Sequence, residues 1–175
     1  MTSGTELLWG VRPATGEVSS ACFSPCRTWR YELLRRWGGG PTLNVIGLNP
    51  STADETRNDP TVSRCLGYAR RWGFGALVVT NIFALRSTDS AGLRVVPDPV
   101  GPDNDLSLRR VATHSDAVLV AWGAGGALGG RAADVRELLS GVDVRCLGAT
   151  KAGEPRHPLY LRKDALVVPY AAPSR

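Results

Sequence analysis

Four apolar runs of strand length, each followed by a polar or glycine-rich loop, most constrain what this chain can fold into. The runs occupy residues 43–48, 76–81, 117–122 and 144–147. They are nearly continuous and do not alternate with polar residues, as a strand with one solvated face would. Each run is therefore predicted to be a strand covered on both faces.

Helical segments lie between these runs. The clearest covers residues 60–72, where Pro60 follows Asp59 and the apolar residues Val62, Leu66 and Ala69 share one side. Further helices are expected near residues 103–113 and 131–139. Strands that alternate with helices predict an α/β fold, here a three-layer α/β/α sandwich with a mostly parallel central sheet.

The remaining segments are less regular. Residues 1–20 are polar and mixed, which fits a leading strand or a loose N-terminal arm. Alternating Trp29, Tyr31 and Leu33 favour a strand within residues 27–37, although a short helix also fits there. Residues 86–102 contain glycine and three prolines and are predicted to be irregular. Residues 165–168 are expected to form a last strand.

Length and composition indicate one domain spanning residues 1–175. A chain of 175 residues buries roughly 70% of its unfolded surface, so it needs neither a metal nor a disulfide to fold. The formal net charge of +5 permits an anionic partner such as nucleic acid, nucleotide or phosphate. Most of the cationic residues are arginines, which suits phosphate binding but also fits a GC-rich coding sequence.

The sequence contains no predicted membrane-spanning segment and no predicted export signal. No apolar run reaches the roughly 20 residues that span a bilayer, and residues 1–10 lack a basic region followed by an apolar one. The chain is therefore expected to be cytoplasmic, with reduced cysteines. The spacing of Cys22, Cys26, Cys65 and Cys146 fits neither a zinc ribbon nor an iron–sulfur cluster, so no metal or other cofactor is expected.

Chemically versatile residues follow each of the apolar runs. Asn49 follows the first, Asn81 ends the second, and Trp122-Gly123 ends the third. The fourth leads into residues 150–160, a basic loop that contains His157. Since ligands of parallel sheets bind at the carboxyl ends of the strands, these residues predict one shared site.

These residues also carry a resemblance to a known family. The segments 47–54 (GLNPSTAD), 58–61 (NDPT), 81–84 (NIFA), 121–123 (AWG) and 155–160 (PRHPLY) together resemble the family known as domain of unknown function 1643. The similarity runs from about Trp29 to Val168. The family name implies no activity.

More distantly, the layout resembles the uracil-DNA glycosylase superfamily. Residues 47–50 (GLNP) are similar to its first motif, Asn81 matches its base-recognising asparagine by position, and His157-Pro158 matches its late motif. The resemblance implies a uracil-DNA-glycosylase-like fold. It also implies that Asn49 positions a water molecule, Asn81 reads a flipped base and His157 stabilises the departing base.

Further roles follow from this mapping. The aromatic residues Phe83, Trp122 and Tyr160 are expected to stack on the base, and the polar residues Ser51, Thr52, Lys151 and Arg156 to contact phosphate. Two departures stand out. The late motif lacks the usual serine after its proline, and Asn49 replaces the aspartate of the most active branch. Asp54, Glu55 and Asp59 are the candidates for the missing general base.

Structural interpretations remain open beside these roles. Residues 49–52 also suit a turn or helix cap, Asp59-Pro60 an ordinary helix start, and Asn81 a turn. Trp122 also suits a plain core position. The glycine-rich residues 123–130 invite a phosphate-loop interpretation but lack the lysine of a P-loop.

The sequence thus predicts an N-glycosyl hydrolase resembling DNA glycosylases, with DNA or a nucleotide as its partner. Two alternatives stay open. The protein is a non-catalytic nucleic-acid or nucleotide binder, or it is another enzyme of modified-base or nucleotide metabolism.

Overall fold

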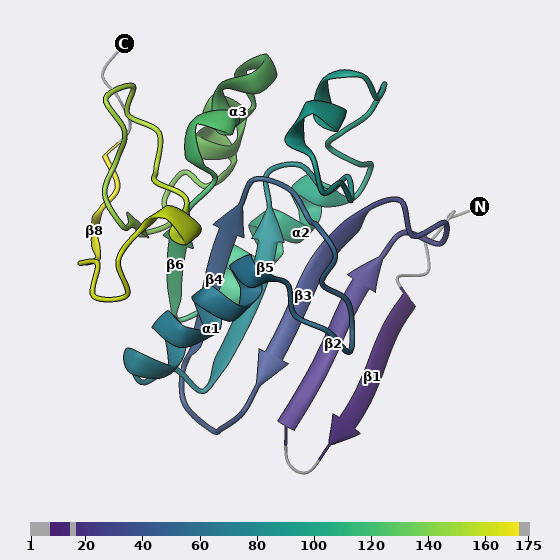
Figure 1. The fold of residues 1–175 in the computed structure, drawn as a ribbon, viewed down its shortest axis with the longest axis vertical. Coiled ribbons are helices and arrows are strands. Elements are labelled where there is room, and N and C mark those ends of the chain that lie inside the picture. The colour runs from purple at the N-terminus through teal and green to yellow at the C-terminus, as the bar shows by residue number, and fades with distance from the viewer. Residues whose placement is uncertain (1–7, 15–16, 172–175) are drawn as a thin grey trace.

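A single mixed sheet runs through the computed structural model, which describes residues 8–14 and 17–171 (Figure 1). Across the sheet the strands are β1 (Leu8–Ala14), β2 (Glu17–Phe23), β3 (Arg30–Arg36), β5 (Ala76–Asn81), β4 (Thr42–Gly47), β6 (Ala117–Val120), β7 (Val144–Cys146) and β8 (Val168–Pro169). Strands β5, β4, β6 and β7 are parallel. The flanking strands β1, β2, β3 and β8 pair antiparallel.

The expectation of a mostly parallel sheet is therefore correct only for the centre. Parallel neighbours need a long crossover, whereas short connections join antiparallel strands. Between β1 and β2 the chain has only two residues, and between β2 and β3 only a short turn. This N-terminal meander adds an antiparallel half to the sheet, so the fold is mixed α/β.

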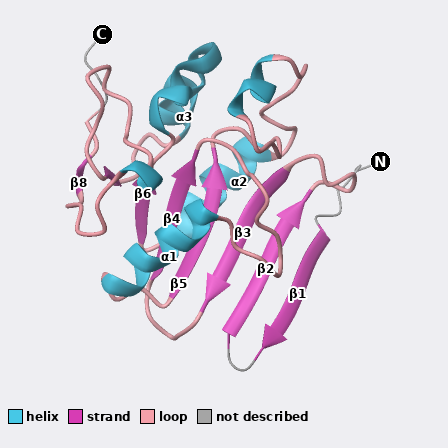
Figure 2. Ribbon diagram, in the orientation of Figure 1, coloured by secondary structure: helices cyan, strands magenta, loops and turns pink. Residues whose placement is uncertain are grey.

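Within the described residues, three α-helices cover the two faces of the sheet (Figure 2). They are α1 (Pro60–Arg71), α2 (Asn104–His114) and α3 (Arg131–Leu138), which confirms the helices predicted from periodicity. Helix α1 begins where it does because Asp59 Oδ1 accepts a hydrogen bond from the Val62 backbone N–H at 2.8 Å, with Pro60 at the first helical position. Shorter 3₁₀ turns cover Ser90–Arg94, Gly123–Gly130 and Pro158–Tyr160.

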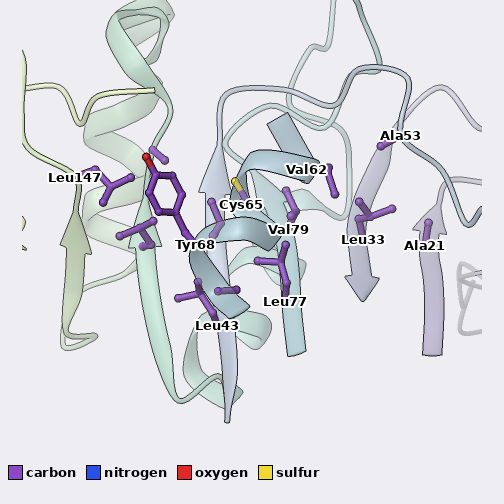
Figure 3. Packing of buried hydrophobic residues seen from close by; sticks show 14 of the residues in the cluster. Ala21, Leu33, Leu43, Ala53, Val62, Cys65, Tyr68, Leu77, Val79 and Leu147 are labelled. Carbon is purple, nitrogen blue, oxygen red and sulfur yellow. The ribbon is translucent and has the colours of Figure 1, made fainter. Parts of the chain in front are cut away.

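The core divides into two apolar layers, one on each side of the sheet. Leu43 of β4 packs with Val62 and Tyr68 of α1 on one face (Figure 3), and Val45 belongs to the same cluster. On the other face, residues of α2 and α3 pack against β6, with Ile46 of β4 among them. The strands alternate between two buried faces, which explains their continuous apolar sequence.

Two segments differ from the sequence expectation. The last strand is Val168–Pro169 and not residues 165–168, and Leu166 is 81% exposed, so this apolar stretch is not core. The strand predicted over residues 117–122 is β6, which stops at Val120. Trp122 lies beyond its end but remains buried. Of the N-terminal 20 residues, the described part forms β1 and the start of β2, while residues 1–7 and 15–16 lie outside the described residues. No helix in the described ranges has the length and apolarity to cross a membrane.

Candidate functional site

A cavity of about 750 Å³ opens at the carboxyl ends of the parallel strands. Its walls come from the loops after β4 and β6, the long loop after β5, and the segment between β7 and β8 (Figure 1). Seven residues singled out from the sequence line it: Asn49, Ser51, Asp59, Trp122, Arg156, His157 and Tyr160. The predicted convergence of these loops is thus present in the fold.

A smaller cavity of about 40 Å³ continues from the larger one towards the sheet. Asn49, Asp59 and His157 line both, and the smaller one adds Asn81 and Arg30. The inner end of the pocket therefore holds several polar side chains, while apolar residues of β4, β5 and α1 make up much of its wall.

Asn81 is held at the inner cavity by the register of the sheet. It pairs with Gly47 in the parallel ladder between β4 and β5. A Cβ atom at position 47 would lie 2.7 Å from Asn81 Oδ1, so only glycine leaves room for this side chain. Asn81 is buried, and its Nδ2 has no hydrogen-bond partner in the described structure. A buried amide donor without a partner is costly, and a ligand acceptor would satisfy it.

His157 has one ring nitrogen committed to the backbone. Its Nδ1 accepts a hydrogen bond from the Leu159 N–H at 3.4 Å, capping the short helix that follows. That contact assigns the proton of the neutral ring to Nε2, which is then a donor. Burial lowers the pKa of His157, and the negative charge of Asp59 opposes that shift. His157 is thus a neutral hydrogen-bond donor at physiological pH.

The structure separates the three carboxylates that the sequence offered as a general base. Asp54 Oδ1 accepts hydrogen bonds from Thr56 and Arg57 within its own turn, and Asp54 does not line either cavity. Glu55 forms a two-fold ion pair with Arg27 at 2.8 and 3.0 Å. Asp59 alone of the three faces the site.

Asp59 uses only one of its two carboxylate oxygens in a hydrogen bond within the described structure. Oδ1 caps α1, and no hydrogen bond to Oδ2 occurs within the described part of the chain. The side chain is buried and lines both cavities. The same residue therefore caps α1 and presents a carboxylate to the cavity.

Asn49 is both a structural residue and a site residue. Its Nδ2 donates to the Pro50 carbonyl at 3.0 Å and to the Ser87 carbonyl at 2.9 Å. These bonds fasten the loop after β4 to the loop after β5. With both N–H groups committed, the oxygen Oδ1 is the part of Asn49 that can accept a hydrogen bond from water or ligand.

Several predicted site residues lie away from the cavity. Phe83 is buried in the core on the α2 side, and Thr52 and Lys151 are exposed and line neither cavity. Trp122 is only 1% exposed, so it forms wall instead of an open stacking surface. Tyr160 differs from these. It is 86% exposed at the mouth, and its ring lies 5.5 Å from that of His157.

A buried polar network fixes the loop that carries Arg156 and His157. Trp122 Nε1 donates to Glu154 Oε2 at 2.6 Å, and Arg136 Nη1 lies 3.6 Å from Glu154 Oε1. Arg136 also donates to the Tyr170 hydroxyl at 2.8 Å, and that hydroxyl donates to the Gly153 carbonyl at 3.0 Å. The network joins α3, the residues that follow β6 and the C-terminal segment to the loop.

Sequence reasoning did not identify Arg30, Glu154 or the residues Ser87, Thr88 and Ser90 of the cavity wall. Ser87 and its neighbours belong to a stretch that composition marks only as irregular. Glu154 lies three residues before His157, and its charge beside Trp122 and Arg136 is visible only in three dimensions. Arg30 stands at the start of a strand, where an arginine usually reaches solvent.

The glycine-rich residues 123–130 form part of the cavity wall and a short 3₁₀ turn. Gly123, Ala124 and Gly125 line the cavity, and the Gly123 N–H is already bonded to the Pro155 carbonyl at 2.8 Å. The N-terminus of α3 does not line the cavity. The cysteines come from separate segments, and no group of three or more potential metal ligands occurs among the described residues.

Fold and cavity define a mixed α/β protein with a polar site at the carboxyl edge of its parallel strands. The chain belongs to the family described as Protein of unknown function (DUF1643), whose model matches residues 30–159. The matched span includes Arg30, Asn49, Asp59, Asn81 and His157. No curated protein and no solved structure matches the chain.

Proposed function

We propose that the pocket binds a nucleobase joined to sugar phosphate and hydrolyses the N-glycosidic bond. The observation that carries this proposal is the meeting of Asn81, Asp59 and His157, from three separate segments, at one inner cavity. A base reader, a carboxylate and a neutral donor are the three groups that this reaction requires. The order of motifs shared with uracil-DNA glycosylases supports the same assignment.

The residues divide the chemistry as follows. Asp59 accepts a proton through the oxygen that does not cap α1, from a water molecule that Asn49 Oδ1 helps to orient. The water oxygen bonds to C1′ of the sugar as the C1′–N bond breaks, and the bonding electrons leave with the base. His157 Nε2–H donates to an oxygen of the departing base, where negative charge develops. The products are the free base and a sugar with a hydroxyl at C1′.

The outer cavity suits the rest of a nucleotide. Tyr160 offers an exposed ring beside His157, and Arg156 and Ser51 supply donors at the wall. Arg156 uses its Nε to bind the Ala149 carbonyl at 3.1 Å, which leaves its terminal nitrogens for phosphate.

The test uses DNA that contains uracil, hypoxanthine or hydroxymethyluracil, followed by cleavage at abasic sites, with free nucleotides in parallel. We expect base release by the wild type. Asp59→Asn preserves the helix cap, since asparagine caps as well as aspartate, but lowers the rate by about 100-fold because it accepts no proton. The matched control is Asp54→Asn, the same change outside the cavity, which leaves the rate intact.

One observation favours a second function, binding without hydrolysis. Asn49 stands where the most active branch of the uracil-DNA glycosylase superfamily has aspartate, and both of its amide N–H groups are bonded to the backbone. A protein that releases no base from any of these substrates, yet binds them, is such a binder. In that case Asp59→Asn and wild type would be indistinguishable in every arm of the assay.

A further inference from the structure

The inner cavity contains a buried arginine that the reaction above does not use. Arg30 is 2% exposed, and its Nη1 donates to the Ala53 carbonyl at 2.7 Å. Arg30 Nε has no hydrogen-bond partner in the part of the chain that the structure describes, and the Arg30 side chain forms no ion pair there within 4.0 Å. A buried guanidinium with unused N–H groups is energetically unfavourable unless another group compensates for it.

The surroundings of Arg30 compensate only in part. Burial lowers the pKa of Arg30 to about 10, and the charge of Asp59 is the largest effect that opposes the shift. Asp59 already spends one oxygen on the cap of α1. The arginine therefore keeps its positive charge in a buried site, where the charge of Asp59 acts on it but the described structure gives it no ion pair within 4.0 Å.

Asn81 adds a second unmet donor to the same cavity. Its Nδ2 is buried without a partner, as is Arg30 Nε, and both residues line the 40 Å³ space. His157 contributes a third donor through Nε2. The residues that carry these donors come from three segments and line one volume, which holds only a few water-sized atoms. That volume admits a carboxylate or the oxygen-bearing edge of a planar ring.

We propose that the inner cavity is an oxyanion subsite, in which Arg30 and Asn81 bind a negatively charged oxygen on a planar group of the ligand. The group is a carboxylate or the anionic oxygen that a keto base acquires as it leaves its sugar. The proposal concerns the pocket of the proposed function, but it requires only binding and holds whether or not a glycosidic bond is cleaved.

The test compares formate with formamide, two planar molecules of the same size that differ in charge. Each is titrated into the full-length protein at constant ionic strength, and the Arg Nε–H resonances are followed by ¹H–¹⁵N NMR. The resonance that disappears in Arg30→Lys belongs to Arg30. We expect formate to shift that resonance in a saturable manner and formamide to leave it in place.

Variants separate the subsite from general charge. Formate affinity in each variant is read from the backbone amide resonances that formate shifts in the wild type, because Arg30→Lys lacks the Arg30 Nε–H. Arg30→Lys should weaken formate binding by about tenfold or more, because a charged hydrogen bond is lost. Asn81→Asp should abolish formate binding, since it replaces the second donor with a carboxylate. The matched control is Arg35→Lys on the same strand. Arg35 is also buried but donates to the Asp54 and Arg57 carbonyls and lines neither cavity.

Three outcomes would overturn the proposal. They are equal shifts with formate and formamide, no shift with either, and formate affinity that is unchanged in folded Arg30→Lys or Asn81→Asp protein. Asn81→Asp keeps the experiment decisive if Arg30→Lys does not fold. Formate binding without base release leaves the subsite standing and removes only the hydrolase activity.

Discussion

At the residue scale, Gly47 shows how a short motif can be dictated by a neighbouring strand. The Asn81 side chain lies over this glycine, 2.7 Å from where a Cβ would stand. Gly47→Ala is expected to displace Asn81 and to weaken ligand binding by about tenfold, with a loss of roughly 1–3 kcal/mol in the free energy of unfolding from overpacking. Calorimetric titration with formate measures the loss of binding, and urea denaturation measures the loss of stability.

Gly39→Ala is the control for this change. Gly39 is exposed, and a Cβ there meets nothing within 4 Å. Ligand affinity in Gly47→Ala equal to that in Gly39→Ala would show that Asn81 does not depend on the glycine.

His157 predicts a pH dependence of stability. Burial lowers its pKa below the ordinary 6.5, so the unfolded chain binds a proton more readily than the folded one. Between the lowered pKa and about 6.5 the unfolded state carries more protons, and stability must rise with pH. The contribution is complete above about pH 7 and is lost as the pH falls through the folded pKa.

Urea unfolding of wild type and His157→Gln between pH 5 and 8 measures this contribution. The difference between the two free energies of unfolding should grow with pH below 6.5 and then level off. His114→Gln, a change at the exposed histidine of α2, should leave the wild-type profile unchanged. A constant difference across the range would mean that the environment of His157 does not disfavour its charged form.

Residue types with a positional signal could be predicted from the sequence. Asn49, Asn81 and His157 each follow an apolar run, and the carboxyl ends of parallel strands share one edge, so their meeting was foreseeable. Arg30 was not foreseeable, because nothing in its local sequence distinguishes a buried arginine from an exposed one. The roles of Asp54 and Asp59 differ only through contacts, which a list of nearby carboxylates does not reveal.

At the element scale, the central strands and helices were predictable because each buries a face against a neighbour. The apolar runs became β4, β5, β6 and β7, and the periodic segments became α1, α2 and α3. The antiparallel half was missed because pairing direction depends on the connections between strands. The segment after β7 was misjudged since its apolar residues, Leu166 among them, are mostly exposed and pack little.

That segment depends instead on polar anchors, which makes Glu154 a test of how the element is held. Glu154→Ala leaves Trp122 Nε1 and Arg136 without their acceptor in a largely buried place. We expect a loss of about 3 kcal/mol in the free energy of unfolding, measured by urea denaturation. Glu154→Gln, which can still accept from Trp122, should cost about 1 kcal/mol.

Glu137→Ala serves as the control, because Glu137 is an exposed carboxylate on α3. If Glu154→Ala lowers the free energy of unfolding no more than Glu137→Ala does, the network does not stabilise the loop. A second readout is the affinity for the ligand, which Glu154→Ala should reduce because Arg156 and His157 lie on the same loop.

At the scale of the whole molecule, the net charge of +5 becomes informative only through its placement. A second hollow of about 480 Å³ lies along α1 and shares Pro60 and Leu159 with the mouth of the main cavity. Arg64, Arg71 and Lys163 line it, and no acidic residue does. No ion pair involves these three side chains within the described ranges. A polymer with phosphates beyond the bound nucleotide would meet this surface, whereas a free nucleotide would not.

The double charge reversal Arg64→Glu and Lys163→Glu therefore distinguishes a DNA substrate from a nucleotide. For DNA, we expect weaker binding and a slope of log affinity against log salt that is smaller by about 1–2, because up to two phosphate contacts are lost. Fluorescence anisotropy of labelled DNA at several salt concentrations measures both quantities.

The control variant reverses two cations that line neither the main cavity nor this hollow, Arg109 of α2 and Arg145 of β7, for the same change in net charge. If both double variants alter DNA binding equally, charge acts through its total and the hollow is not a path for the backbone. If neither alters it while the pocket variants do, DNA is held through the pocket alone and its backbone does not run along the hollow.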